Sequence, residues 1–138
     1  MTYDSLKKFF LIILEAQGDL SILPPEKRPA AVLEMYEAKG LRTAMRVLRS
    51  DLAILMVPLQ TMPPEKMAEI NDKLAKEGAP SIAMVKAWMN RKNSPVFERG
   101  YIVSDDEFYR LGALVDQLDG EEERLVRSLL DKYEFRER

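Results

Sequence analysis

The tetrapeptide Pro-Pro-Glu-Lys occurs twice in this chain, at 24–27 and at 63–66. Proline is a favourable first residue of a helix, because it lacks only an N–H that would have no partner there, and an early glutamate suits the helix dipole. Each copy opens an amphipathic stretch that ends near a glycine, Gly40 or Gly78, and a second amphipathic stretch follows. The two copies start 39 residues apart, so the repeat predicts two stacked helical hairpins.

Apolar residues recur at intervals of three and four along most of the chain, which is the period of an α-helix. Asn93-Ser94-Pro95 breaks this pattern, and residues 97–103 are expected to form a short extended piece. Ser104 followed by Glu107 is a capping box that starts a third hairpin. The predicted helices cover residues 4–16, 25–39, 41–56, 64–77, 82–92, 105–118 and 121–134.

Each predicted helix has one apolar face that we expect to be buried. Met35 and Met84 fall off these faces, as does Ile82, and we expect them to line a groove for a partner. The predicted buried faces, in chain order, are Leu41, Met45, Leu48 and Leu52; Met67, Ile70 and Leu74; Val85, Trp88 and Met89; Phe108, Leu111, Val115 and Leu118; and Leu125, Val126, Leu129, Leu130 and Tyr133.

The chain has 138 residues, of which 46% are hydrophobic and 32% are charged. This is the composition of a folded protein, and the length suffices for a core without metals or disulfides. We therefore expect one all-α domain, a compact helical-hairpin bundle or short superhelix of about six to seven helices. Its predicted parts are a lead helix (1–22), two hairpins (23–60 and 61–100) and an acidic third hairpin (104–138).

The residue types that are missing argue against catalysis. The chain contains no histidine and no cysteine, so the commonest general base and the thiolate nucleophile are both absent. It also has no Gly-x-Gly-x-x-Gly loop and no Walker motif for a phosphate. The acidic runs 105–107 and 121–123 open predicted helices, where capping and the helix dipole account for them. We therefore expect no enzyme activity, no metal site and no cofactor.

The expected location follows from the hydropathy and the charge. The apolar run 9–14 is far shorter than the roughly 20 residues that span a bilayer. The formal net charge of -2 gives no general attraction to nucleic acids or membranes. We expect a soluble, cytoplasmic protein with no membrane partner.

The best candidate site is a stripe of four cations at intervals of three and four, namely Lys39, Arg42, Arg46 and Arg49. Residues at this spacing share one face of a helix, and no acidic residue lies between positions 37 and 51. At 100° per residue the stripe is rotated by roughly a quarter to a third of a turn from the predicted apolar face. It predicts a contact with an anion, which is a phosphate backbone, an acidic helix of a partner or the acidic C-terminal hairpin of the chain itself.

A second candidate lies at residues 71–90, which resemble the helix-turn-helix of phage repressors at Leu74, Ala75, Val85 and Trp88. The resemblance implies a contact with DNA through the second helix. Glycine and proline at positions 78 and 80 depart from the motif, which has buried aliphatic residues there. The outward positions would include Ile82 and Ala87, and the candidate nucleic-acid or partner contacts are Ser81, Lys86, Asn90, Arg91 and Lys92.

The helix starts at 23–27 and 62–66 also resemble those of short-helix superhelical modules, such as the cytoplasmic domain of magnesium transporters and the flagellar switch proteins. That resemblance implies a helical superstructure and assigns no family. The favoured hypothesis is a small regulatory or adaptor protein that binds another protein through the basic stripe, with Lys86 and Arg91 from the second hairpin. The alternatives are a DNA-binding protein that uses 71–90 and the basic helix 39–49, and a structural homo-oligomer.

Overall fold

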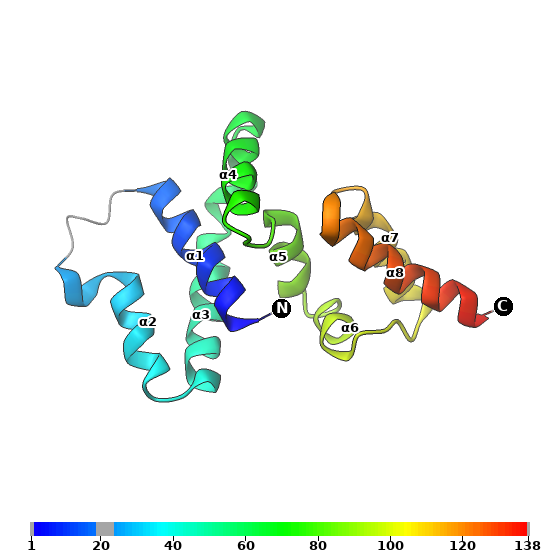
Figure 1. Ribbon diagram of the computed structural model, residues 1–138, viewed down its shortest axis with the longest axis horizontal. Coiled ribbons are helices and arrows are strands. Elements are labelled where there is room, and N and C mark those ends of the chain that lie inside the picture. Colours follow the sequence, from blue (N-terminus) through cyan, green and yellow to red (C-terminus); the bar gives the residue numbers. More distant parts are fainter. Residues whose placement is uncertain (1, 19–23, 138) are drawn as a thin grey trace. The chain divides into compact units, whose positions relative to one another are not determined.

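The computed structural model describes residues 2–18 and 24–137, and every regular element in it is a helix (Figure 1). The all-α prediction is therefore confirmed, with eight α-helices and two 3₁₀ helices among the described residues. The predicted boundary between residues 22 and 23 lies outside them. The elements are α1 (Tyr3–Gln17), η2 (Pro25–Lys27), α2 (Pro29–Glu37), α3 (Leu41–Leu55), η3 (Pro58–Thr61), α4 (Pro64–Lys76), α5 (Ile82–Met89), α6 (Ser94–Arg99), α7 (Asp105–Val115) and α8 (Gly120–Glu137).

The contacts divide the chain into two compact units, Thr2–Pro80 and Ser81–Arg138. The first, the N-terminal unit, contains α1 to α4, and the second, the C-terminal unit, contains α5 to α8. The predicted hairpin at 61–100 is thus divided, because its first helix belongs to one unit and its second to the other. The single domain expected from the sequence stays a prediction.

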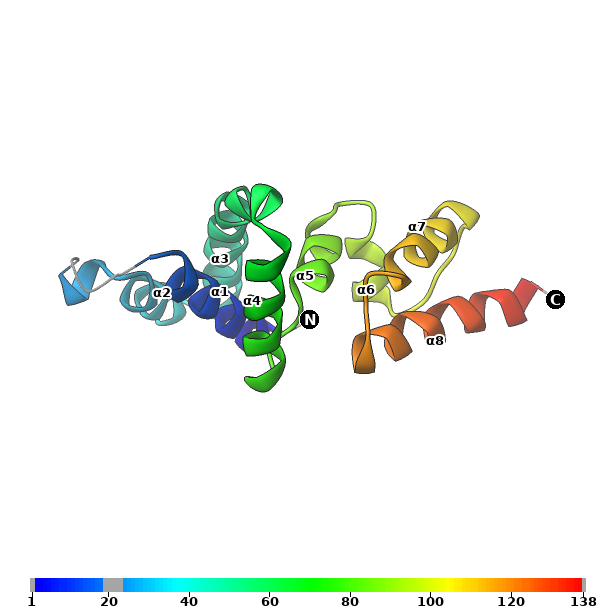
Figure 2. The same cartoon turned by 90° about the horizontal axis from the view of Figure 1, so that it is seen from above.

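In the N-terminal unit, α3 packs against both α1 and α2, and α1 also packs against α4 (Figures 1 and 2). Five apolar residues of α1 are buried, namely Leu6, Phe9, Phe10, Ile12 and Ile13. The core of this unit contains fully or almost fully buried side chains from all four helices: Leu6, Phe9, Phe10, Ile13, Leu33, Ala44, Leu48, Leu52, Ile70 and Leu74.

A partly buried polar cluster connects α1 to the end of α2. Lys7 Nζ donates to both carboxylate oxygens of Glu37, at 2.9 and 2.8 Å, and the Tyr3 hydroxyl donates to Glu37 Oε2 at 3.2 Å. The hydrogen bond from Lys7 holds the pKa of Glu37 below its usual value. Burial, together with the hydrogen bond to Glu37 and its negative charge, raises the pKa of Tyr3 from 10.0 to about 12.

The helix predicted at 25–39 is wrong in its first turns. Residues 25–27 form the separate 3₁₀ helix η2, and α2 begins only at Pro29. Between them Arg28 is extended, with φ -69° and ψ 143°, because the ring of a following proline disfavours the α conformation in the residue before it. Proline therefore starts α2 itself, and the Pro-Pro-Glu-Lys of the first copy precedes it.

The second Pro-Pro-Glu-Lys copy starts α4 as predicted, and this helix ends at Gly78. The N–H of Ala79 donates to the carbonyl of Leu74 at 2.8 Å, and the N–H of Gly78 donates to that of Ala75 at 3.2 Å. This pair of bonds is a Schellman motif, which requires a left-handed residue at the glycine position. Gly78 has φ 72°, a conformation that costs little only without a Cβ.

The buried face of α3 differs from the prediction at its N-terminal end. Leu48 and Leu52 are buried as expected, but Leu41 is 65% exposed and Ala44 is fully buried instead. Ala44, Leu48, Leu52 and Leu55 share one face, and a methyl side chain lets the neighbouring helices approach closely. The buried face of α3 is therefore centred on the side of the helix that carries Ala44.

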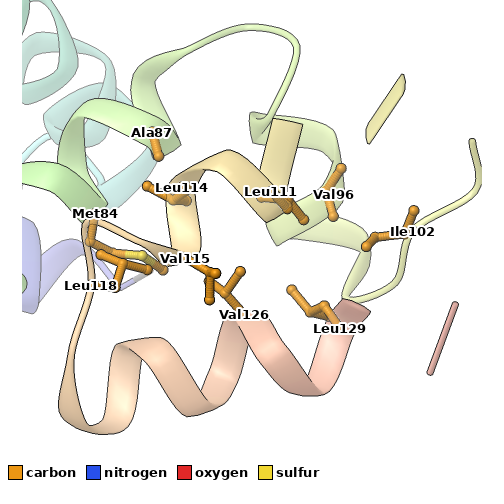
Figure 3. Close-up of a cluster of buried hydrophobic side chains, with 10 residues drawn as sticks. All are labelled: Met84, Ala87, Val96, Ile102, Leu111, Leu114, Val115, Leu118, Val126 and Leu129. Carbon is orange, nitrogen blue, oxygen red and sulfur yellow. The ribbon is translucent and has the colours of Figure 1, made fainter. Parts of the chain in front are cut away.

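In the C-terminal unit, the antiparallel pair α7 and α8 covers a core to which α5 and α6 contribute (Figure 3). Met84 lies in this core and Ile82 is also buried, so the predicted groove at these two residues is wrong. Leu125, predicted to be buried, is 51% exposed. Helix α8 packs against the core through Val126 and Leu129, and the residue before Val126 points away from that core. The core residues are Met84, Ala87, Val96, Ile102, Leu111, Leu114, Val115, Leu118, Val126 and Leu129.

The extended piece predicted at 97–103 is also wrong over its first half. Residues 94–99 form α6, because Pro95 in the first turn is compatible with a helix and Val96 is buried in the core. The helix ends at Gly100, whose φ of 85° is left-handed. Arg99 then reaches forward over the loop: its guanidinium donates twice to the carbonyl of Tyr101, at 3.1 Å each.

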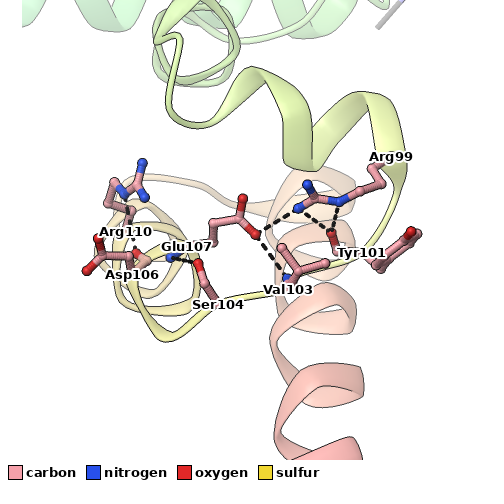
Figure 4. Close-up of polar contacts among 7 residues, drawn as sticks. All are labelled: Arg99, Tyr101, Val103, Ser104, Asp106, Glu107 and Arg110. Atoms are coloured by element: carbon pink, nitrogen blue, oxygen red, sulfur yellow. Dashed lines mark hydrogen bonds and ion pairs between the residues drawn. The ribbon is translucent and has the colours of Figure 1, made fainter.

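Glu107 joins this loop to the start of α7 (Figure 4). As the capping box predicts, the N–H of Glu107 donates to Ser104 Oγ at 3.3 Å. The reciprocal bond goes one residue further back, since Glu107 Oε1 accepts from the N–H of Val103 at 2.9 Å and from Arg99 Nη2 at 2.7 Å. Burial raises the pKa of Glu107, but the Val103 N–H and the Arg99 guanidinium outweigh burial and hold that pKa below its usual value.

Replacing Glu107 by Gln should lower the free energy of unfolding by about 1–3 kcal/mol, because a half-buried guanidinium loses its counter-charge. Glu107 binds fewer protons in the folded than in the unfolded state, so its contribution is present above the ordinary pKa of about 4.3 and disappears as pH falls through the lowered folded pKa. Urea denaturation at neutral and acid pH should show a smaller loss of stability on acidification in the variant. Asp106→Asn, which changes an exposed carboxylate of the same turn, is the control and should keep the wild-type pH dependence.

Replacing Glu37 by Gln should bring the pKa of Tyr3 part of the way back from about 12 toward 10.0, since burial persists while the negative charge is lost. In the wild type, Tyr3 contributes fully to stability below pH 10, and that contribution is lost as pH rises toward 12. Titration of the phenolate absorbance measures this, and Tyr3→Phe identifies which of the five tyrosines titrates last. An unchanged last titration in Tyr3→Phe would contradict the assignment.

Candidate binding surface

The structure places the four predicted cations on the outside of the N-terminal unit, around the start of α3. Lys39, Arg42 and Arg46 are exposed, and Arg49 is half-buried. Lys39 comes from the turn between α2 and α3, and its ammonium lies 5.4 Å from the centre of the Tyr36 ring. We call the four residues the basic surface.

The basic surface faces away from the core further than the sequence predicts. At 100° per residue, Arg42 lies about 140° and Arg46 about 180° from the centre of the buried face that Ala44 and Leu48 define. The only acidic residue of α3, Asp51, lies about 180° from Arg42 on the same helix. Burial raises the pKa of Asp51 above its usual value, and its carboxylate cannot reach the arginines across the helix.

Two arginines of this surface, Arg42 and Arg46, have little internal compensation. Arg42 and Arg46 form no ion pair with any residue that the structure describes. Glu37, the acid at the end of α2, is held by Lys7 in an ion pair of 2.8 Å. The positive charge at the start of α3 is therefore available to an external anion.

Placement of a cation at the start of α3 works against the helix. Gly40 provides no side-chain cap, the first turn contains no acidic residue, and Arg42 stands in that turn, close to the positive end of the helix dipole. By contrast, α7 begins with a serine cap and three acidic residues. A residue that destabilises its own secondary-structure element is often found at a functional site.

An apolar edge borders the arginines. This edge is not expected from the sequence, because Leu41 is predicted to lie in the core. Leu41 is 65% exposed, and Met45, one turn later on the same side, is half-buried. Met35 of α2 is 57% exposed, as expected for a residue off the buried face. The position of Leu41, directly after the glycine that precedes α3, is the feature of the sequence that indicates its exposure.

The acidic residues that open α7 and α8 are mostly engaged within the C-terminal unit. Their partners are an arginine, a backbone N–H or a hydroxyl. The engaged pairs are Asp105 with the Tyr133 hydroxyl (2.5 Å), Glu107 with Arg99 (2.7 Å), Glu122 with the backbone N–H of Ser81 (3.0 Å), and Glu123 with Arg127 (2.9 Å).

The second set of predicted contact residues lies in the C-terminal unit, around α5. Ser81 caps this helix by accepting from the N–H of Met84 at 3.1 Å. Asn90 accepts from the backbone N–H of Lys92 at 2.9 Å and so shapes the turn after the helix. Lys86, Arg91 and Lys92 are exposed. Two of the five residues thus have structural roles.

The element 71–90 lacks the outward face that its resemblance to a helix-turn-helix implied. Ile82 and Ala87, expected to point outward, are 4% and 8% exposed. The reason is that α5 spans only Ile82–Met89 and is buried on most sides, with Lys86 the one fully exposed residue in it. The unit boundary at Pro80 and Ser81 also falls between the two helices of the element.

No group of three or more acidic, histidine or cysteine side chains among the described residues is placed to hold a metal ion. No helix in that part of the chain is long and apolar enough to cross a membrane.

Comparison with known proteins adds no further constraint: no family model, no curated protein and no solved structure matches the chain. The basic surface is therefore the feature on which a functional proposal rests.

Replacing Arg42 by Glu should increase the free energy of unfolding by about 0.5–1.5 kcal/mol, because an acid replaces a cation at the start of α3 and can pair with Arg46 four residues later. Arg42→Gln should give a smaller increase. Urea denaturation of the three proteins measures the series. A loss of stability in the glutamate variant would mean that Arg42 is needed for the fold.

Proposed function

We propose that this protein is a non-catalytic adaptor or regulatory protein that binds an acidic, amphipathic helix of a partner protein through the basic surface. The observation that carries the proposal is the pair of exposed arginines, Arg42 and Arg46, which form no ion pair with the described residues and stand where they weaken their own helix.

The apolar edge favours a protein partner. Arginine and methionine are enriched in protein–protein interfaces, and Leu41 with Met45 supplies an apolar strip directly beside the charges. A helix that carries carboxylates on one face and leucines beside them matches this arrangement. A nucleic-acid backbone would use the arginines and leave the exposed Leu41 without a counterpart.

The spacing of the two arginines determines the spacing of the carboxylates that we expect on the partner. Arg42 and Arg46 are one helical turn apart, so their Cα atoms lie about 6 Å apart along and around the helix. Carboxylates at positions i and i+4 of a partner helix have the same spacing. Arginine can bind each of them through two parallel hydrogen bonds.

We expect a peptide helix with glutamates at four-residue intervals beside leucines to bind the wild type, and Arg42→Gln/Arg46→Gln to weaken binding by about tenfold, the effect of two exposed charge pairs. Isothermal titration at two salt concentrations measures this, and the binding should persist partly at high salt because of the apolar contact.

Lys66→Gln/Lys76→Gln is the matched control, since it removes two exposed cations from α4 of the same unit. Equal weakening in both double variants would mean that only overall charge matters, which contradicts the proposal. Binding of mixed-sequence duplex DNA instead of the peptide, with a steep salt dependence and loss in the arginine variant, would favour the nucleic-acid alternative.

A further inference from the structure

Helix α4 carries acidic side chains at the spacing that the basic surface requires of a partner. Glu65, Glu69 and Asp72 follow one another at intervals of four and three residues, so they share one face of the helix. All three are exposed, and they form no ion pair with any residue that the structure describes. We call these three residues the acidic stripe.

The cations of α4 leave the acidic stripe open to an external partner. Lys73, four residues after Glu69, pairs with Glu15 of α1 at 3.6 Å. Lys66 directly follows the first residue of the stripe, so it lies about 100° round the helix from that residue. Lys76 lies in the last turn of α4, where a cation suits the helix dipole.

The acidic stripe and the basic surface are complementary in charge and in spacing. Glu65 and Glu69 are like charges at positions i and i+4, and such a pair weakens its own helix. Arg42 and Arg46 form a like-charge pair with the same spacing on α3. Within the described part of one chain, no ion pair joins these glutamates to these arginines. Contact between the two pairs would therefore relieve a repulsion in both helices.

The apolar neighbours of the two charge pairs are also arranged alike. Leu41 and Met45 directly precede the two arginines of α3. Pro64 and Ala68, which are both exposed, directly precede the two glutamates of α4. The apolar edge thus lies on the same side of the charges in each helix, when the helix is viewed from its N-terminus. Two facing helices that run antiparallel bring such edges together, and the small side chain of Ala68 permits a close approach.

We propose that α4 of a second copy of this chain binds the basic surface, so that the protein self-associates head to tail and an acidic partner helix must displace the second copy. In the antiparallel arrangement Glu69 faces Arg42 and Glu65 faces Arg46. Each copy carries both faces, so the contact is heterologous and further copies can add to it. This inference rests on the role proposed above for the basic surface as a binding face for an acidic helix.

Sedimentation equilibrium of the full chain over a range of concentrations tests the contact. The weight-average mass of the wild type should rise above that of one chain as concentration increases, and added salt or the glutamate–leucine peptide should lower it again. Arg42→Gln/Arg46→Gln and Glu65→Gln/Glu69→Gln should each weaken the association by about tenfold, the effect of two exposed charge pairs. Circular dichroism confirms that each variant is folded.

A mixture of the two double variants isolates the single contact. Each variant retains the face that the other lacks, so equal amounts should form a one-to-one complex about tenfold more tightly than either variant associates alone. This complex should not grow further, because it has no intact face left. Asp106→Asn/Asp116→Asn is the matched control, since it removes two exposed carboxylates from the C-terminal unit and should leave the association unchanged.

The outcomes separate the two proposals. A wild type that stays monomeric at the highest concentrations while it binds the peptide overturns the self-association and leaves the adaptor function in place. A mixture that associates no better than its components overturns the pairing of α4 with the basic surface, and so does equal weakening in the control. Association that follows the charge variants as expected, with no binding of the peptide, supports the self-association and contradicts the adaptor function. A wild type that neither associates nor binds the peptide overturns both.

Discussion

The packing of α3 against both α1 and α2 is the constraint on which the N-terminal unit and its basic surface depend. A helix that is covered from two sides must bury one continuous face, and α3 does so with Ala44, Leu48, Leu52 and Leu55. The small side chain of Ala44 permits the close approach. Once this face is set, the helical period turns the arginines toward solvent and leaves Leu41 exposed beside them.

The same constraint determines which charges are compensated. Glu37, at the end of α2, lies against α1 and is bound by Lys7 and Tyr3, so this acid is used to hold two helices together. In the C-terminal unit, Glu107 and Glu123 are likewise bound by arginines of their own unit. Most ion pairs of the described residues thus serve the fold, and the arginines at the start of α3 stand apart from them.

The start of α3 has fewer favourable local interactions than the start of α8. The other hairpin begins its second helix with three glutamates, which suit the helix dipole, and one of them, Glu123, pairs with Arg127. The start of α3 has neither a cap nor an acid.

The sequence by itself determined the helical class, the end of α4 at Gly78 and the cap at Ser104, because these depend on local period and local hydrogen bonds. It also predicted the basic surface, of which the structure places Lys39 in the turn before α3 and Arg42, Arg46 and Arg49 on α3 itself. Only the tertiary structure decided that Ala44 rather than Leu41 is buried, that Met84 belongs to a core, and that Glu107 pairs with Arg99. These features depend on which neighbour covers a helix, and neighbours distant in sequence leave no trace in the period of a single segment.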